Sequence, residues 1–284
     1  MKTLAKHTMV YDADCPLCAA YTKSFMTAQM LDKDGRIAYQ QVGGSFCPGM
    51  DAERAKNEIA LVNLETGEVK YGLESLLTII EHRFKWMGTI ARIQPLKFFL
   101  QKLYNFISYN RKVIIPAKPI ESKGDARKFD CTPTFKLKYR IAYILVVWLL
   151  TSLTLVEYSH LLGGFIPATN FYREFLICGG QVLFQSISVG ILIAVRGKGA
   201  KEIVEYLGNM MTVSFFGALL LLPAILTGSV FTAISPVIFL AYFMLVVGVM
   251  FFEQARRMKL LELGWWPSVS WVLYRLIVLA LLVI

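Results

Sequence analysis

Two cysteines near the start of the chain have the spacing of a redox-active pair. Cys15 and Cys18 are separated by two residues in the run Asp12-Ala13-Asp14-Cys15-Pro16-Leu17-Cys18. The run lies between an apolar segment and a helical pattern, so Cys15 is expected at a helix N-terminus, where backbone N–H groups favour a thiolate. Cys18, one turn later, points to the same side and can resolve a mixed disulfide formed at Cys15. The pattern predicts thiol–disulfide exchange.

The elements around this pair follow a recognisable order. Apolar and turn patterns predict strands over residues 7–11 and 37–42, a hairpin over 59–64 and 68–71, and helices over 16–30, 51–58 and 73–86. The resulting order, β-α-β-α-β-β-α, is the thioredoxin topology. The expected fold class is therefore an α/β thioredoxin-like N-terminal domain, followed by an all-α membrane domain that is argued below.

The same residues resemble a known family, the DCC-type thiol-disulfide oxidoreductases, whose thioredoxin-like domains are named for an Asp-x-x-Cys-x-x-Cys motif. Asp12, Cys15 and Cys18 carry that motif here, and residues 71–76 and 103–111 are similar to the family's C-terminal pattern. The resemblance covers residues 7 to about 113 and implies a nucleophilic Cys15, a resolving Cys18 and an Asp12 that takes or returns the proton of the second thiol. No dissociable organic cofactor is implied.

Two features qualify this expectation. Asp12 and Asp14 oppose ionisation of Cys15, so we expect a reducing dithiol rather than a strong oxidant. The proline that precedes the third strand of thioredoxins and contacts the substrate backbone is absent, because Asn57 and Glu58 come directly before Ile59. The mode of substrate docking is left open, and a protein or a small thiol or disulfide are both candidates.

Zinc binding is the alternative use of a Cys-x-x-Cys pair. Cys15, Cys18 and Cys47, with Cys131 or His7, would complete four ligands. Structural zinc sites usually show a second paired knuckle, and the sequence contains none, so redox chemistry is favoured over metal binding. Cys47 and Cys131 are more typical of inert thiols.

The second half of the chain has the composition of a membrane domain. Of the 284 residues, 56% are hydrophobic and 18% are charged, and residues 1–140 hold 22 of the 30 Lys and Arg. A bilayer core needs about 20 mostly apolar residues per helix. Five spans are predicted, at residues 141–164, 175–195, two within 206–252, and 265–284.

The charges of the loops orient these spans. Basic residues fall in the loops at 196–201 and 256–259, and basic loops face the cytoplasm. The sequence therefore predicts an integral protein of the cytoplasmic (plasma or inner) membrane, with a cytoplasmic N-terminal domain and the C-terminus outside. The expected domains are 1–90, thioredoxin-like; 91–140, a basic linker; and 141–284, transmembrane.

The linker between the two halves is strongly basic. Residues 92–140 hold 12 Lys and Arg against three acids, with aromatic residues interleaved at helical spacing. This pattern favours an amphipathic helix on a surface of anionic lipids. Nucleic acid would use the same charges, but a bilayer is the nearer polyanion, so no nucleic-acid partner is predicted.

Two hypotheses concern the membrane half. Arg275 lies near the middle of the last span, where an arginine is costly without a partner; it either pairs with Glu174 or Glu157 or extends to the interface. The second hypothesis is the alternative to an enzymatic function: the chain is a non-enzymatic transporter-like or assembly subunit. Its soluble domain is then a redox- or zinc-responsive regulatory module.

Overall fold

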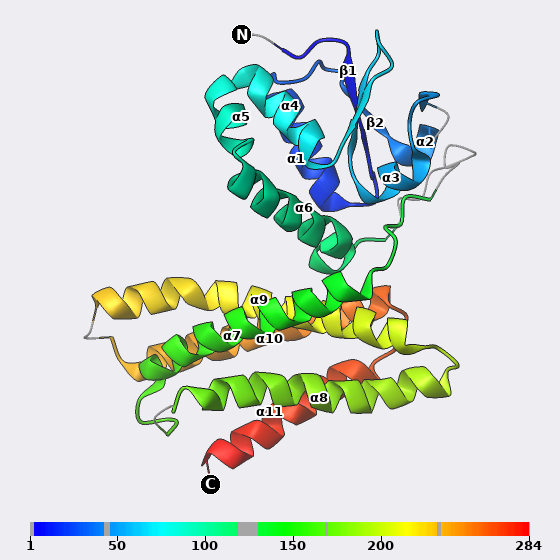
Figure 1. The fold of residues 1–284 in the computed structure, drawn as a ribbon. Coiled ribbons are helices and arrows are strands. Elements are labelled where there is room, and N and C mark those ends of the chain that lie inside the picture. The colour runs from blue at the N-terminus through cyan, green and yellow to red at the C-terminus, as the bar shows by residue number, and fades with distance from the viewer. Residues whose placement is uncertain (1–2, 43–45, 119–129, 168–169, 232–233, 284) are drawn as a thin grey trace. The chain divides into compact units, whose positions relative to one another are not determined.

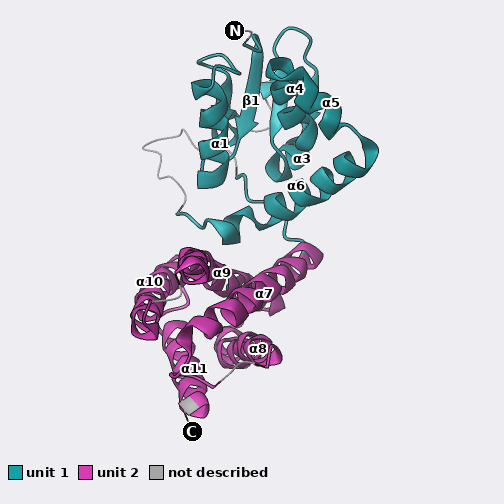
Figure 2. Cartoon of the chain, turned by 90° about the vertical axis from the view of Figure 1, so that its left-hand side faces the viewer, with its two compact units in different colours: residues 1–136 teal, residues 137–284 magenta. Residues whose placement is uncertain are grey.

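The chain folds into two compact units, residues 1–136 and 137–284 (Figures 1 and 2). The structure is a computed structural model, and it describes residues 3–42, 46–118, 130–167, 170–231 and 234–283. Part of the predicted linker, residues 119–129, lies outside these ranges. The predicted boundaries at residues 90 and 140 stay predictions; the two compact units divide after residue 136, which puts most of the predicted linker in the first unit.

A four-stranded mixed sheet forms the centre of the first unit. Its strands are β1 (His7–Tyr11), β2 (Arg36–Ala38), β3 (Ala60–Asn63) and β4 (Val69–Tyr71). They lie in the order β2-β1-β3-β4, with β1 parallel to β2 and antiparallel to β3, and with β4 antiparallel to β3. This arrangement confirms the predicted thioredoxin-like fold class.

In the residues of this unit that the structure describes, six α-helices accompany the sheet (Figure 1): α1 (Pro16–Thr27), α2 (Tyr39–Val42), α3 (Ala52–Asn57), α4 (Leu73–Arg83), α5 (Lys85–Ala91) and α6 (Gln94–Ile114). The strand predicted over 37–42 was too long. β2 pairs with β1 only as far as Ala38, opposite Tyr11 where β1 ends, so the following residues turn into α2. The helix predicted over 73–86 is interrupted at Phe84, whose extended φ of −128° separates α4 from α5.

Apolar side chains alternate between the two faces of the sheet. Val10, Ala60 and Val62 pack in one cluster together with Cys47 and Cys131. Met9 and Leu61, their neighbours along the strands, pack on the opposite face, as the two-residue period of a strand requires. Cys47 and Cys131 are thus parts of the core of the first unit.

The second unit is helical. It consists of α7 (Leu137–Ser159), the short 3-10 helix η2 (His160–Leu162), α8 (Tyr172–Val195), α9 (Ala200–Val230), α10 (Pro236–Leu260) and α11 (Trp266–Val283). In the described residues, α7 with η2, α8, α9 and α10 are long and apolar enough to cross a membrane, and α11 is apolar but shorter. These elements fit the predicted all-α membrane domain of about five helices.

Hydrogen bonds attach the short helix α11 to α8. Ser270 Oγ donates to Gln185 Oε1 at 3.0 Å, and Tyr274 OH donates to the Ile177 carbonyl at 2.6 Å. Trp266 Nε1 donates to Ser188 Oγ at 3.2 Å. Polar bonds of this kind hold helices together where the surroundings provide no hydrophobic driving force, so α11 is a bonded part of the bundle.

Of the alternatives for Arg275, the pairing with Glu174 or Glu157 is not the arrangement that the structure shows. The Arg275 guanidinium lies 3.3 Å from the centroid of the Trp271 ring, and with the Gln181 amide oxygen turned toward it, Arg275 Nη1 donates to that oxygen at 2.7 Å. Glu174 is bound by the neighbouring Arg173 at 2.5 Å. The register of α8 against α11 brings Gln181 to Arg275, and this register cannot be predicted from the sequence pattern.

Candidate functional site

Cys15 occupies the N-terminal cap of α1, directly after the loop that leaves β1. Its sulfur accepts a hydrogen bond from the Cys18 backbone N–H at 3.4 Å, and Pro16 stands in the first turn, where its missing N–H costs no hydrogen bond. Both thiols are buried and neither forms a disulfide. The predicted position of Cys15 at a helix N-terminus is therefore the one observed.

The two thiols have opposite acid–base properties. Hydrogen bonding by the Cys18 side chain, then by the Cys18 backbone N–H, and the charge of Arg111 lower the pKa of Cys15 to about 7 against the opposing effects of burial and Asp12. The hydrogen bond to Cys15, together with burial, raises the pKa of Cys18 well above its usual value. Near neutral pH the pair therefore holds its negative charge on Cys15.

The Asp12 carboxylate is fully engaged beside this pair. Its Oδ1 accepts hydrogen bonds from Gln40 Nε2 at 2.7 Å and from the Asp14 backbone N–H at 3.1 Å. Its Oδ2 forms an ion pair with Arg111 Nη2 at 3.1 Å, and both side chains are almost completely buried. From the sequence, the Asp12 charge was expected to oppose ionisation of Cys15, whereas in the structure Arg111 lies beside Asp12 and offsets that charge.

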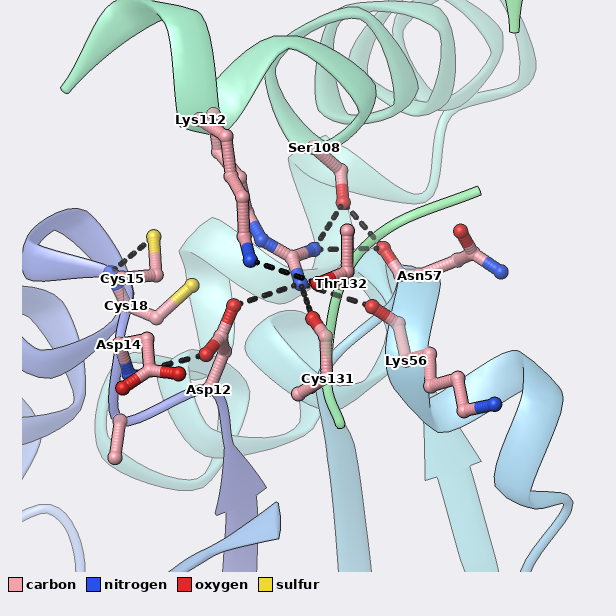
Figure 3. Close-up of polar contacts among 12 residues, drawn as sticks. Asp12, Asp14, Cys15, Cys18, Lys56, Asn57, Ser108, Lys112, Cys131 and Thr132 are labelled. Carbon is pink, nitrogen blue, oxygen red and sulfur yellow. Dashed lines mark hydrogen bonds and ion pairs between the residues drawn. The ribbon is translucent and has the colours of Figure 1, made fainter. Parts of the chain in front are cut away.

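Arg111, on α6, joins four segments of the first unit. Besides Asp12, its Nη2 donates to the Lys56 carbonyl at 2.8 Å and to the Cys131 carbonyl at 3.3 Å, and its Nη1 donates to the Asn57 carbonyl at 3.2 Å. Figure 3 shows these carbonyls converging with the Asp12 carboxylate. In the sequence, Arg111 was part of the family resemblance and of the basic linker, and no role was predicted for it. The only sequence signal for the role of Arg111 was its position as a basic residue after the apolar face of a helix.

Side chains of α6 bind several backbone groups of the segment before β3. The Asn57 carbonyl accepts from both Arg111 and Ser108 Oγ, and the Ile59 N–H donates to Tyr104 OH at 3.1 Å. This is the position where thioredoxins present the proline that the sequence lacks. The Asn57 carbonyl and the Ile59 N–H at this position are thus bound by side chains of α6.

A cavity of about 220 Å³ lies beside Cys18. Its walls are mainly apolar and include Leu17, Tyr21, Leu76, Tyr104 and Ile107, with Asp12 and Arg111 at its polar side. Burial raises the pKa of Tyr104 to about 12, so this phenol stays neutral. The cavity is the concave feature closest to the dithiol, and it has room for a small or apolar group.

The proposed zinc ligands are not assembled. Among the residues that the structure describes, no group of three or more His, Cys, Asp or Glu side chains is close enough to hold a metal ion. Cys131 reaches the site through its carbonyl, while its buried thiol has a pKa raised to about 12, mainly by burial. Cys47 belongs to the core of the unit.

Comparisons with known proteins agree with the N-terminal geometry. Residues 9–115 match the sequence profile of a family described as DCC1-like thiol-disulfide oxidoreductase, which confirms the resemblance inferred from the motif and supports a redox role. A protein of Arabidopsis thaliana, described as uncharacterized and chloroplastic, is 26% identical over 135 residues. The alignment spans 45% of this chain and 62% of that relative. No solved structure matches the chain.

We expect the alkylation rate of Cys15 in the reduced protein to rise with pH and to reach half its maximum near pH 7, because the thiolate reacts. Replacing Arg111 with Gln removes a positive charge and should move this midpoint upward by about one pH unit. Alkylation over a pH series followed by mass spectrometry measures both. Cys131 is the internal control, since its thiol should stay unmodified over the same range. A wild-type midpoint at pH 9 or above would contradict the assignment, and circular dichroism verifies that the variant is folded.

Proposed function

We propose that the chain is a membrane-anchored thiol–disulfide oxidoreductase in which Cys15 attacks and Cys18 resolves. The observation that carries this proposal is the asymmetry of the pair: a hydrogen-bonded Cys15 whose pKa is lowered to about 7, one turn before a Cys18 whose pKa is raised. The family match over residues 9–115 supports the same chemistry. The anchor consists of the apolar helices that begin at Leu137.

The reaction begins at Cys15. Its thiolate forms a bond to one sulfur of a substrate disulfide, the substrate S–S bond breaks, and the departing sulfur leaves with the electron pair and takes up a proton. Cys18 then loses its proton and attacks the Cys15 sulfur, which releases the second substrate thiolate. Two electrons pass from the dithiol to the substrate, and an external thiol reductant returns the Cys15–Cys18 disulfide to the dithiol.

Asp12 is the proposed acceptor of the Cys18 proton. Its carboxylate borders the same cavity as Cys18 and is held by donors from Gln40 and Arg111. Arg111 acts through Asp12 and the Cys15 charge, so we assign it a positioning role. A nucleophile with a pKa of about 7 suits a reductant, since strongly oxidising dithiols have much lower values, near 3.5.

The substrate is proposed to be a disulfide with a small or apolar group next to its sulfur, on a protein or a small molecule. The occupied carbonyls of Lys56 and Asn57 leave little scope for pairing with an extended peptide at this position. The mainly apolar cavity beside Cys18 offers the alternative contact. Apolar and aromatic walls of this kind are typical of small-molecule sites.

The dithiol is proposed to lie on the cytoplasmic side of the cytoplasmic membrane. In this orientation, the helix ends that face the cytoplasm carry basic residues. Two of these residues have polar partners: Arg140 forms an ion pair with Glu205 at 3.3 Å, and Arg257 donates a hydrogen bond to Asn209 at 3.1 Å. A reducing compartment keeps thiols of this kind reduced.

A Cys18→Ser variant should accumulate a mixed disulfide with its substrate. Cys15 can still attack, but the group that would release the product is gone. Non-reducing electrophoresis of membranes after acid quenching, followed by mass spectrometry, detects the adduct and identifies its partner. The matched control, Cys15→Ser, should form none. Equal trapping by both variants, or by neither, would refute the assigned roles.

Replacing Asp12 with Asn should slow the second step and spare the first. Asp12 raises the pKa of Cys15, so its neutral replacement leaves Cys15 at least as acidic. Loss of the proton acceptor should slow resolution roughly 100-fold. Stopped-flow measurement with a chromogenic disulfide separates attack from resolution. Unchanged resolution would remove Asp12 from proton transfer, and circular dichroism tests whether the variant retains its fold.

A cysteine added after Ile284 should react with a membrane-impermeant maleimide in intact cells, because the predicted orientation puts the C-terminus outside. A cysteine at Lys33, an exposed residue of the first unit, should react only after the cells are permeabilised. Protection of the C-terminal cysteine in intact cells would contradict the orientation.

A further inference from the structure

Helices α5 and α6 expose a broad apolar surface on the first unit. Trp86 and Phe98 are each 65% exposed and Phe99 is 60% exposed. The surface, here called the α5–α6 face, consists of Trp86, Met87, Ile90, Ile93, Phe98, Phe99, Leu103 and Ile107. Soluble domains rarely expose contiguous apolar surface of this extent unless it contacts a partner or a membrane.

The two sides of α6 show that this exposure is built into the helix. The side turned toward the unit carries Tyr104, Ser108 and Arg111, which bind the backbone at the site. Phe98, Phe99 and other large apolar residues of α6 are exposed. These exposed side chains favour an apolar medium or partner on the outer side of the helix.

The charges on these helices favour an anionic partner. Between residues 85 and 114 there are six Lys and Arg and no Asp or Glu. Arg92, Lys97 and Arg111 are bound by acids of the first unit. Lys85 and Lys102 form no ion pair with the described residues, and the Lys102 ammonium lies 5.1 Å from the centroid of the Phe98 ring. Aromatic rings with lysines at their edge are typical of helices that lie in a lipid interface.

The chain itself brings a bilayer near. α6 ends at Ile114 and the first apolar helix long enough to cross a membrane begins at Leu137, so the linker between them is short. We propose that the α5–α6 face inserts into the headgroup region of the anionic membrane in which the second unit is embedded. This contact is independent of the proposed redox reaction.

The insertion has a structural consequence for the site. The helix that enters the lipid interface is the one that supplies Arg111, Ser108 and Tyr104 to the first unit. Ile107 belongs to both the α5–α6 face and the wall of the cavity beside Cys18. One edge of the cavity therefore adjoins the lipid, where apolar substrates concentrate.

Lipid quenching tests this in the full chain. In a Cys15→Ser, Cys18→Ser background, an environment-sensitive fluorophore is attached to Phe98→Cys or, as matched control, to Lys33→Cys. The protein is reconstituted into vesicles of phosphatidylglycerol and phosphatidylcholine. A spin-labelled lipid with a shallow nitroxide should quench the label at position 98 at least fivefold more than the label at 33, while aqueous iodide should quench only the latter. Vesicles of phosphatidylcholine alone should reduce the lipid quenching.

A second measurement excludes an effect of the dye itself. With the label at Ile90→Cys, the double replacement Phe98→Ser and Phe99→Ser should lower lipid quenching, and Leu64→Ser, which changes an exposed apolar residue outside the α5–α6 face, should not. Iodide quenching of position 98 would overturn the proposal in favour of a solvated face. Protection from both quenchers would overturn it in favour of a protein partner. Neither readout depends on catalytic activity.

Discussion

The buried ion pair between Asp12 and Arg111 is the interaction on which the first unit depends. It links the loop after β1 with α6, two segments that are 99 residues apart in the chain, and both side chains are almost inaccessible to water. Losing one partner of such a pair costs about 3–5 kcal/mol, because the remaining charge stays buried. The same guanidinium binds the carbonyls of Lys56, Asn57 and Cys131. One side chain thereby connects α6 to the loop after β1, the end of α3 and the segment at Cys131.

This pair also explains how two thiols can differ so much in acidity within one helical turn. Cys15 takes the N-terminal cap, where the Cys18 N–H and thiol both donate to it, and Arg111 adds a positive charge that outweighs the nearby carboxylate. Cys18, one turn inside the helix, is left protonated by its hydrogen bond to Cys15 and by burial. Local helix geometry therefore determines which thiol is the more acidic, and the Arg111 charge offsets that of Asp12.

What the sequence could predict was local. The cysteine spacing, the proline in the first turn and the alternating strands depend on neighbours within a few residues, and each led to the observed element. The partner of Asp12 could not be found in this way, because a contact across 99 residues leaves no periodic signal. The same limit applies to Arg275, whose contact with Gln181 depends on the register of α8 against α11. β2 was too long in the prediction because its end is set by the end of β1.

Helix α6 has different requirements on its two sides. Its inward side supplies a buried arginine and two hydroxyls that bind the Asn57 carbonyl and the Ile59 N–H. Its outward side carries exposed aromatic rings. In a freely soluble protein, the contact of these rings with water would be unfavourable. Both sides make sense together if the unit works at a bilayer, since the outward rings find an apolar medium there. The absence of the substrate-binding proline of thioredoxins then fits a site whose accessible edge adjoins lipid, because Arg111 and Ser108 occupy the backbone that an extended peptide would use.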